Sequence, residues 1–357
     1  MCLAWVPSGP SPLPGSGFNK QAAGSLIRSP LAAAPTKALV RTKFGPPEVL
    51  RLKDVERPAP ADNEVLVEVH ASSLNKSDWF NLKPPAPFRL FSGLKPKSEG
   101  IGGDFAGRIV AVGASVKQFR PGDEVYGVAK GALAEFALAR EDRFAAKPVN
   151  LSFAEAAAVP VAGLTALQGL RKGMIRAGQR VLIDGSSGGV GTFAVQVAKS
   201  FGAEVTAVCS GNNLETARSL GADHVIDYSQ EDFTKEDTRY DLILGVNGYH
   251  SVFSYKRALS PAGAYLMVGS HKVISELVQV AILGRVLSRG GGKSLSFMGI
   301  AKVTQDDLVR LKELAEAGKI KPFVDRTYSL AEAAGAFRYL GQGHARGKVV
   351  VTVDHQN

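Results

Sequence analysis

The chain has 357 residues, more than one typical domain holds, and its 45% hydrophobic and 21% charged residues are ordinary for a soluble globular protein. The net charge is +10, but the basic residues are scattered without a long run, which argues against a nucleic-acid partner. Only Cys2 and Cys209 are present, so a disulfide framework is excluded and a reducing compartment is favoured. The most apolar late stretch, 274–287, is shorter than the roughly 20 apolar residues of a membrane span.

The N-terminal extension, residues 1–36, differs from the rest of the chain. It is rich in Pro, Ser, Gly and Ala, and no Asp or Glu precedes Glu48. An acid-poor, basic, Ser-containing N-terminus is typical of an organellar transit peptide, and a disordered tail is the alternative. We therefore expect a plastid or mitochondrial protein if the extension is a transit peptide, and a cytoplasmic one otherwise.

Residues 37–154 are predicted to form the first part of a β-rich substrate domain. Short β-type runs are broken by Pro and Gly, at 37–42, 64–70, 107–113 and 123–128. Helical signals are nearly absent here, and the four prolines between 80 and 102 predict a long loop.

Residues 155–300 are predicted to form a Rossmann domain. The switch comes near Leu151, where Ser152 and Glu155 form a capping box before an Ala-rich helical stretch ending at Lys172. Strand-like runs then alternate with helical ones, and the strands are expected at 180–184, 204–209, 224–228, 241–246, 264–269 and 294–300. The intervening helical stretches include 192–202, 213–221, 251–260 and 274–289. Six apolar strands with helical crossovers predict a parallel, doubly wound sheet.

The last segment, residues 301–357, is predicted to return to the first domain. An amphipathic helix is expected at 304–318, followed by a strand at 323–330, a short helix at 331–341 and a final strand at 348–353. We expect these last strands to complete the sheet of the first domain.

A glycine-rich loop carries the clearest functional signal. The strand 180–184 runs into G-S-S-G-G-V-G and then directly into a helix, as a dinucleotide-binding loop requires. Gly185 allows the tight turn, Gly188 lets the backbone approach a pyrophosphate, and Gly191 lets the helix pack on the strand. The predicted cofactor contacts from this loop are Gly185, Ser187, Gly188, Gly189, Val190 and Gly191.

The same loop also fits the G-x-S-x-G elbow of a serine hydrolase, through Gly185, Ser187 and Gly189. Asp241 with either His250 or His344 would then complete a triad. That elbow follows several strands of its sheet, whereas the strand before Gly185 opens this one. The order of elements therefore favours dinucleotide binding.

The end of the second strand predicts which nicotinamide cofactor binds. An acid there would bind the ribose hydroxyls of NAD and repel the 2′-phosphate of NADP, but the strand ends in Ser210, with Asn213 just beyond and no carboxylate. Tyr228, which ends the third strand, either reaches the same pocket or packs on the sheet. We therefore expect NADPH to be preferred over NADH, although the turn holds no Arg or Lys.

The chain from about residue 37 to 353 resembles the medium-chain dehydrogenase/reductase family, quinone-oxidoreductase type. The runs that carry the resemblance include GPPEVL, NKSD, GGDFAGRIVAVGASVKQFRPGDEVYG, GSSGGVG, SLGADHVIDY and HARGKVVVTV. The resemblance implies an α/β fold in which a GroES-like β-rich domain carries an inserted doubly wound Rossmann domain. It further implies a small-molecule substrate in the cleft between the domains and a homodimer.

Zinc relatives in this family use a Cys near the position of Asn75 and a Gly-His-Glu near Gly102 to Asp104. This chain has Asn75, no His near Asp104, and no cysteine from Leu3 to Val208. Because zinc needs three or four such ligands, the resemblance implies the metal-free quinone or enone reductase branch.

The resemblance also assigns residues to the active site. Asn75, in NKSD, would face the nicotinamide and substrate, Asp78 would order that loop, and Thr165 would lie near the nicotinamide. The purely structural alternatives are a turn residue for Asn75 and an N-cap for Asp78.

The expected reaction delivers hydride from NADPH to a quinone or to the β-carbon of an α,β-unsaturated carbonyl. Asn75 is the first candidate donor to the developing oxyanion, and the sequence identifies no dedicated acid. The alternative function is a noncatalytic NADPH-binding protein, structural or RNA-binding, which the charge of +10 permits.

Overall fold

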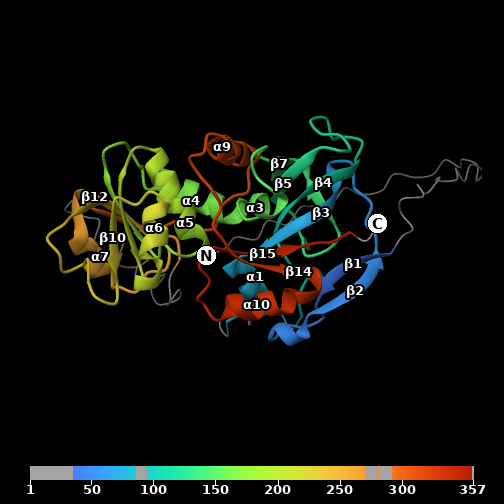
Figure 1. Cartoon of the computed structure of the whole chain (residues 1–357), viewed down its shortest axis with the longest axis horizontal. Coiled ribbons are helices and arrows are strands. Elements are labelled where there is room, and N and C mark those ends of the chain that lie inside the picture. Colours follow the sequence, from blue (N-terminus) through green and yellow to red (C-terminus); the bar gives the residue numbers. More distant parts are fainter. Residues whose placement is uncertain (1–34, 86–92, 94, 270–279, 281–291, 356–357) are drawn as a thin grey trace, which may run out of the picture.

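The computed structural model describes residues 35–85, 93, 95–269, 280 and 292–355 (Figure 1). The transit-peptide hypothesis and the helix expected at 274–289 therefore lie almost wholly outside the described residues. Two large sheets form separate lobes. One has seven strands, six in a continuous order and a seventh beside them, and the other has six.

The seven-stranded sheet belongs to the first and last parts of the chain, and its order is β14-β15-β3-β4-β5-β7, with β6 pairing β3. Its strands are β3 (Glu64–Leu74), β4 (Asp104–Val112), β5 (Glu124–Val128), β6 (Phe136–Arg140), β7 (Phe144–Ala146), β14 (Val324–Ser329) and β15 (Lys348–Thr352). β15 pairs antiparallel with β3, so the C-terminal segment does complete the first domain's sheet, as predicted; Figure 1 shows these late strands beside β3. A separate hairpin joins β1 (Pro35–Val40) to β2 (Arg51–Glu56).

The first domain contains one helix that the sequence patterns did not predict. α1 spans Lys76–Leu82, in a region where helical signals looked nearly absent. At seven residues it is too short for an amphipathic period to show, and it is fixed locally by the backbone N–H of Asn75, which donates to Asp78 Oδ2 at 2.8 Å. The short strands β2, β6 and β7 also escaped prediction.

The six-stranded sheet has the order β10-β9-β8-β11-β12-β13, and all its pairs are parallel. This order, with the first strand in the centre, is the doubly wound Rossmann arrangement that the sequence predicted. The strands are β8 (Arg180–Asp184), β9 (Glu204–Cys209), β10 (His224–Asp227), β11 (Tyr240–Gly245), β12 (Leu259–Met267) and β13 (Ser294–Phe297). The helices between them include α5 (Gly189–Ser200), α6 (Leu214–Ser219) and α7 (Val252–Ala258).

The stretch expected as one helix after Leu151 forms two. α3 spans Phe153–Ala157 behind the predicted capping box of Ser152 and Glu155, and α4 spans Pro160–Lys172. The break falls at Pro160, which lacks an N–H and restricts the residue before it. Proline is therefore at the first position of α4, where no donor is lost.

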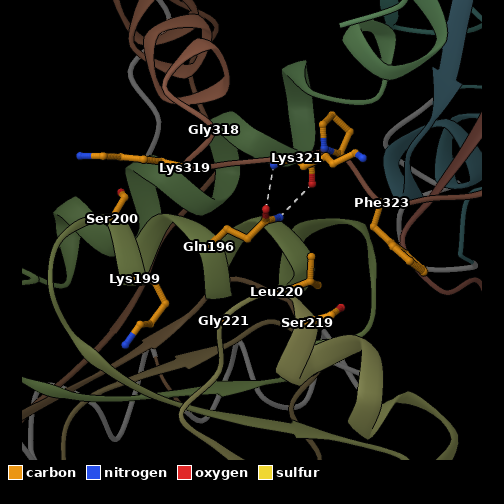
Figure 2. Close-up of a pocket in the computed structure, with 11 residues that line it drawn as sticks. Gln196, Lys199, Ser200, Ser219, Leu220, Gly221, Gly318, Lys319, Lys321 and Phe323 are labelled. Atoms are coloured by element: carbon orange, nitrogen blue, oxygen red, sulfur yellow. Dashed lines mark hydrogen bonds between the residues drawn. The ribbon is translucent and has the colours of Figure 1, made fainter. Parts of the chain in front are cut away.

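Two glutamines fasten the segment that returns from the Rossmann domain. This segment contains α9 (Gln305–Glu316) and leads to α10 (Ala333–Gly341). Before α9, Gln168 of α4 donates to the carbonyl of Lys302 at 2.7 Å and accepts from its N–H at 2.9 Å. After α9, Gln196 of α5 makes the same pair of bonds to Lys321, at 3.0 and 2.7 Å (Figure 2). We call these pairs the glutamine clamps.

The clamp at Gln196 predicts a stability effect. The Gln196 side chain is buried, so Gln196→Ala removes the side-chain partners of the N–H and C=O of Lys321. We expect a loss of about 1–3 kcal/mol in the free energy of unfolding, measured by urea denaturation. Gln118→Ala, at an exposed position, is the control and should change stability by less than about 0.5 kcal/mol. Equal effects of the two substitutions would mean that the clamp contributes nothing.

Candidate functional site

The glycine-rich loop joins the end of β8 to the first turn of α5. Gly185 has φ +92°, a conformation that residues with a side chain avoid. A methyl group at Gly191 would lie 2.2 Å from the carbonyl oxygen of Gly185, so only glycine allows α5 to start this close to the loop. A methyl group at Gly188, the residue that caps α5, would meet no atom within 4 Å. The loop therefore leaves open space beside the helix N-terminus, where a pyrophosphate would meet free N–H groups.

The loop is joined to the first domain by the start of β15. The N–H of Gly347 donates to the carbonyl of Ser187 at 2.8 Å, and Gly188 forms an isolated parallel bridge with Gly347. The stem of the next residue, Lys348, passes under the loop, because a methyl group at Gly189 would lie 2.9 Å from its Cδ. Lys348 therefore links the cofactor loop to the residues of the first domain that its ammonium group contacts.

That ammonium group lies in a buried polar cluster of the first domain. Lys348 is 2% exposed, and its Nζ donates to Asn75 Oδ1 at 2.6 Å, to the carbonyl of Leu74 at 3.2 Å and to Asp104 Oδ2 at 3.3 Å. Asn75 Nδ2 in turn donates to Asp104 Oδ2 at 2.8 Å. The amide of Asn75 is therefore oriented from both ends, with its oxygen toward the ammonium group.

Asp104 accepts hydrogen bonds from every side. Besides the bonds from Lys348 and Asn75, its Oδ2 accepts from Ser73 Oγ at 2.9 Å, and its Oδ1 accepts from the N–H of Val161 at 3.1 Å. Asp104 has no exposed surface. These contacts tie β4 to the first turn of α4 as well as to α1 and β15.

A second buried carboxyl group, that of Asp78, lies beside this cluster. It is 4% exposed, and its Oδ2 accepts the N–H of Asn75. Burial raises the pKa of Asp78 to about 7; the hydrogen bond from Asn75 opposes this rise, the charge of Asp104 adds to it and that of Lys348 opposes it.

Asn75 and Asp78 line a cleft of about 570 Å³. Its lining also contains Gly102, Gly103 and Val161 and the aromatic rings of Phe44 and Phe80. The cationic lining residues are Arg41, Lys97 and Lys130, of which Arg41 is buried. The cleft is of ordinary size for a small-molecule site and combines apolar walls with a few fixed polar groups.

Another cavity, of about 600 Å³, lies between α5 and the returning segment. Figure 2 shows Lys199 and Lys319 pointing in different directions along its wall. The ammonium group of Lys199 is already bound to both carboxylate oxygens of Asp223, at 2.8 and 2.7 Å. This cavity contains none of the predicted site residues and offers no converging charges, so the cleft at Asn75 is the better site.

The residues predicted to contact the 2′-phosphate lie together at the end of β9. Asn213 Nδ2 donates to Ser210 Oγ at 2.8 Å, and Tyr228, which is 53% exposed, follows the adjacent strand β10. A carboxylate that we did not anticipate, that of Asp227, lies at the same turn: a methyl group at Gly211 would be 2.6 Å from its Oδ2. The pKa of Asp227 is lowered, mainly by the N–H of Ser229, with further contributions from the Ser229 hydroxyl and the N–H of Gly211.

Two other expectations can be located in the structure. Thr165 lies on α4, one turn after Val161, and its hydroxyl donates to the carbonyl of that residue at 2.6 Å. Asp241, the acid of the hydrolase alternative, accepts from the N–H of Arg180 at the start of β8, the end opposite to Ser187. A triad of Ser187 and Asp241 is therefore not formed.

Sequence reasoning missed the roles of Lys348 and Asp104, and it did not consider Arg41. Lys348 opens a strand-like run, and charged residues at strand ends are usually solvated, so no local pattern marked it as buried. The sequence offered only an indirect signal for this pair. Asp104 precedes an apolar strand, and a carboxylate buried there needs a cation from elsewhere in the fold.

Comparisons with known proteins agree with this architecture. A family model described as an alcohol dehydrogenase GroES-like domain matches residues 61–168, and one described as a zinc-binding dehydrogenase matches residues 220–351. The chain is 34% identical to the 2-methylene-furan-3-one reductase of Solanum lycopersicum, over 95% of this chain and 85% of that protein. It is 33% identical to an NADPH-dependent alkenal/one oxidoreductase, chloroplastic, of Arabidopsis thaliana, over 88% and 79%.

A solved structure shares the fold. The quinone oxidoreductase from Coxiella burnetii superposes with a TM-score of 0.79 at 31% identity, covering 90% of this chain and all of that one. In the part of the chain that the structure describes, no group of three His, Cys, Asp or Glu side chains is placed to hold a metal ion. Among the same residues, no helix is both long and apolar enough to cross a bilayer.

The fold, the glycine loop and these relatives lead to one conclusion: the chain is an oxidoreductase that belongs to the medium-chain dehydrogenase/reductase family, of the quinone-oxidoreductase type.

Proposed function

We propose that the protein reduces a quinone or an α,β-unsaturated carbonyl with NADPH and without zinc. The observation that carries this proposal is the joining of the glycine loop, through Gly347 and Lys348, to a cleft that contains an oriented asparagine amide. When bound, the cofactor would supply the hydride. The names of the tomato and Arabidopsis relatives support an enone or alkenal as the acceptor.

The residues of the loop and cleft have distinct roles in this proposal. The loop from Gly185 to Gly191 holds the pyrophosphate against the start of α5, and Ser210, Asn213 and Tyr228 surround the 2′-phosphate. The Nδ2 of Asn75 gives one hydrogen to Asp104 and donates the other toward the carbonyl oxygen of the substrate, because its Oδ1 is held by Lys348. Thr165 remains a predicted contact of the nicotinamide.

The alternative of a noncatalytic NADPH-binding protein is disfavoured by the family and by the open cleft at Asn75. A homodimer stays a prediction from the family. An organellar location also stays a prediction, supported by the chloroplastic Arabidopsis relative and by the basic, acid-poor extension.

The first prediction from this proposal concerns turnover and metal. We expect the purified protein to oxidise NADPH with members of a panel of quinones and enones, at a rate that chelators leave unchanged. Metal analysis should find no stoichiometric zinc. Loss of activity on chelation, restored by added zinc, would contradict the metal-free mechanism, and no turnover with any acceptor would favour the noncatalytic alternative.

The second prediction concerns the glycine loop. Gly188→Val should fold, since a Cβ atom there meets no atom within 4 Å, but it should lose NADPH binding because its side chain fills the space of the pyrophosphate. Fluorescence titration with NADPH measures the binding, and thermal unfolding measures the fold. Ser187→Ala is the matched control at the neighbouring position and should be mild. An esterase activity that Ser187→Ala abolished would instead restore the hydrolase hypothesis.

The third prediction concerns cofactor choice. A hydrogen bond to a charged group contributes about 1.5–3 kcal/mol, so two bonds from Ser210 and Asn213 could favour NADPH over NADH by roughly 10²-fold or more. Ser210→Asp should reverse this preference by placing a carboxylate against the phosphate. Asp227→Asn should strengthen it, since it removes the carboxylate that already lies at this turn.

The measurement is kcat/KM for both cofactors with one acceptor. Equal use of NADH by the native protein would show that the charge of Asp227 outweighs the neutral donors. Preferences that stay the same in both variants would place the phosphate pocket elsewhere.

A further inference from the structure

The hydride-transfer reaction also needs a proton, and the position of Asp78 makes it the candidate source. The Asp78 side chain lies in the wall of the same cleft as Asn75. A methyl group at Gly103, which lines that cleft, would lie 3.9 Å from Asp78 Oδ1, while Oδ2 is held by the N–H of Asn75. One oxygen is therefore fixed as an acceptor, and the other lies beside the cleft wall, where a proton can be carried and given up.

The neighbouring carboxyl group, Asp104, is arranged for the opposite state. Both its oxygens accept hydrogen bonds, from Ser73, Asn75, Lys348 and Val161, and none of these contacts needs a proton from Asp104. When the surroundings of two neighbouring carboxyl groups differ in this way, one group can act as the acid while the other stays an anion. Asp104 is the fixed anion, and Asp78 is the group that can take up a proton.

The charged groups around Asp78 keep that proton available for transfer. Burial and the charge of Asp104 favour the neutral acid, whereas the hydrogen bond from Asn75 and the charge of Lys348 favour the carboxylate. Together these groups raise the pKa of Asp78 to about 7. Arg41, the residue after β1, faces Asp78 as well, and its guanidinium donates to the carbonyl of Asn81 rather than to the carboxyl group. Lys97 and Lys130 lie farther out on the lining. An acid with a pKa near the working pH is the most effective proton donor.

We propose that Asp78 is the catalytic acid that protonates the substrate after hydride transfer, and that Asp104 and Lys348 are the positioning residues that set its environment. This inference rests on the proposed reduction of an α,β-unsaturated carbonyl. The β-carbon accepts a hydride, with its electron pair, from C4 of the reduced nicotinamide, and the C=C electrons move to form an enolate stabilised by Asn75. The O–H bond of Asp78 then breaks, its proton goes to the α-carbon, and the carboxylate regains a proton from solvent.

The experiment compares Asp78→Asn with Glu155→Gln. The control is matched because Glu155 also accepts the N–H of its N-cap residue, Ser152, at 2.9 Å, but it lies outside the cleft. The first measurement is an infrared titration of the cofactor-free protein with side-chain-labelled aspartate. We expect a carboxylic-acid band with a midpoint of about pH 7 in the native protein and in Glu155→Gln, and its loss in Asp78→Asn.

The second measurement is the pH dependence of enone reduction. An acid must hold its proton to act, so the native kcat should fall as the pH rises through about 7. Asp78→Asn should bind NADPH normally, lose roughly 10²- to 10⁴-fold in kcat and show no such fall. Glu155→Gln should keep both the native rate and the native pH dependence. A native rate and pH profile in Asp78→Asn, or an ionised Asp78 throughout the titration, would overturn the proposal.

Arg41→Gln provides a second test, which can be carried out even if Asp78→Asn does not fold. Removing this nearby cation should move the infrared midpoint to higher pH, and an unmoved midpoint would show that the titrating group is not Asp78. If the native protein reduced no enone, the proposed function would fail first, and that result is distinct from an active enzyme whose rate is independent of Asp78.

Discussion

An ammonium group that has almost no contact with water holds the active site together. Taking such an ion out of water costs several kcal/mol, and Lys348 recovers this cost only through the carbonyl of Leu74, the amide of Asn75 and the carboxylate of Asp104. Its backbone begins the strand that pairs with β3, and its stem passes under the glycine loop. The relative positions of the cofactor loop and the cleft therefore depend on a charge that the fold cannot leave unpaired.

The same constraint explains why two carboxyl groups so close together behave differently. Asp104 receives donors from two strands, from the residue that caps α1 and from the first turn of α4, whereas Asp78 receives the N–H of a single residue and borders open space. One asparagine contacts both, donating its backbone N–H to Asp78 and its side-chain amide to Asp104. An asparagine in this place can thus combine a capping function with a functional one, and the structural and catalytic interpretations of Asn75 need not exclude each other.

Much of the Rossmann domain could be predicted from sequence because most strands there are continuous apolar runs and Gly185 and Gly191 of the loop have local steric reasons. β8 and β9 match their predicted bounds, and Gly185 and Gly191 meet the conditions that the motif requires. The strands of the first domain were harder to predict. β2 consists mainly of exposed polar residues, and β7 has only three residues. Of the site, the loop and Asn75 were visible in the sequence, whereas Lys348 and Asp227 were not. Their importance comes from pairing between segments distant in the chain, or on adjacent strands, which no linear pattern contains.

The glutamine clamps have a consequence for how this family can diverge in sequence. At Lys302 and Lys321 the two glutamines bind main-chain groups, so every amino acid except proline presents the same partner at those two positions. Asp307 of α9 is different, because Gln168 also donates to its carboxylate at 2.7 Å. Substitutions at Lys302 and Lys321 therefore need no compensating change at the two glutamines, whereas a substitution at Asp307 removes a side-chain partner of Gln168. The reverse does not hold, because no substitution in the segment can replace a lost glutamine. At the two lysine positions selection should thus act on the glutamines alone, which leaves those side chains free to acquire new partners while the path of the segment between the domains stays the same.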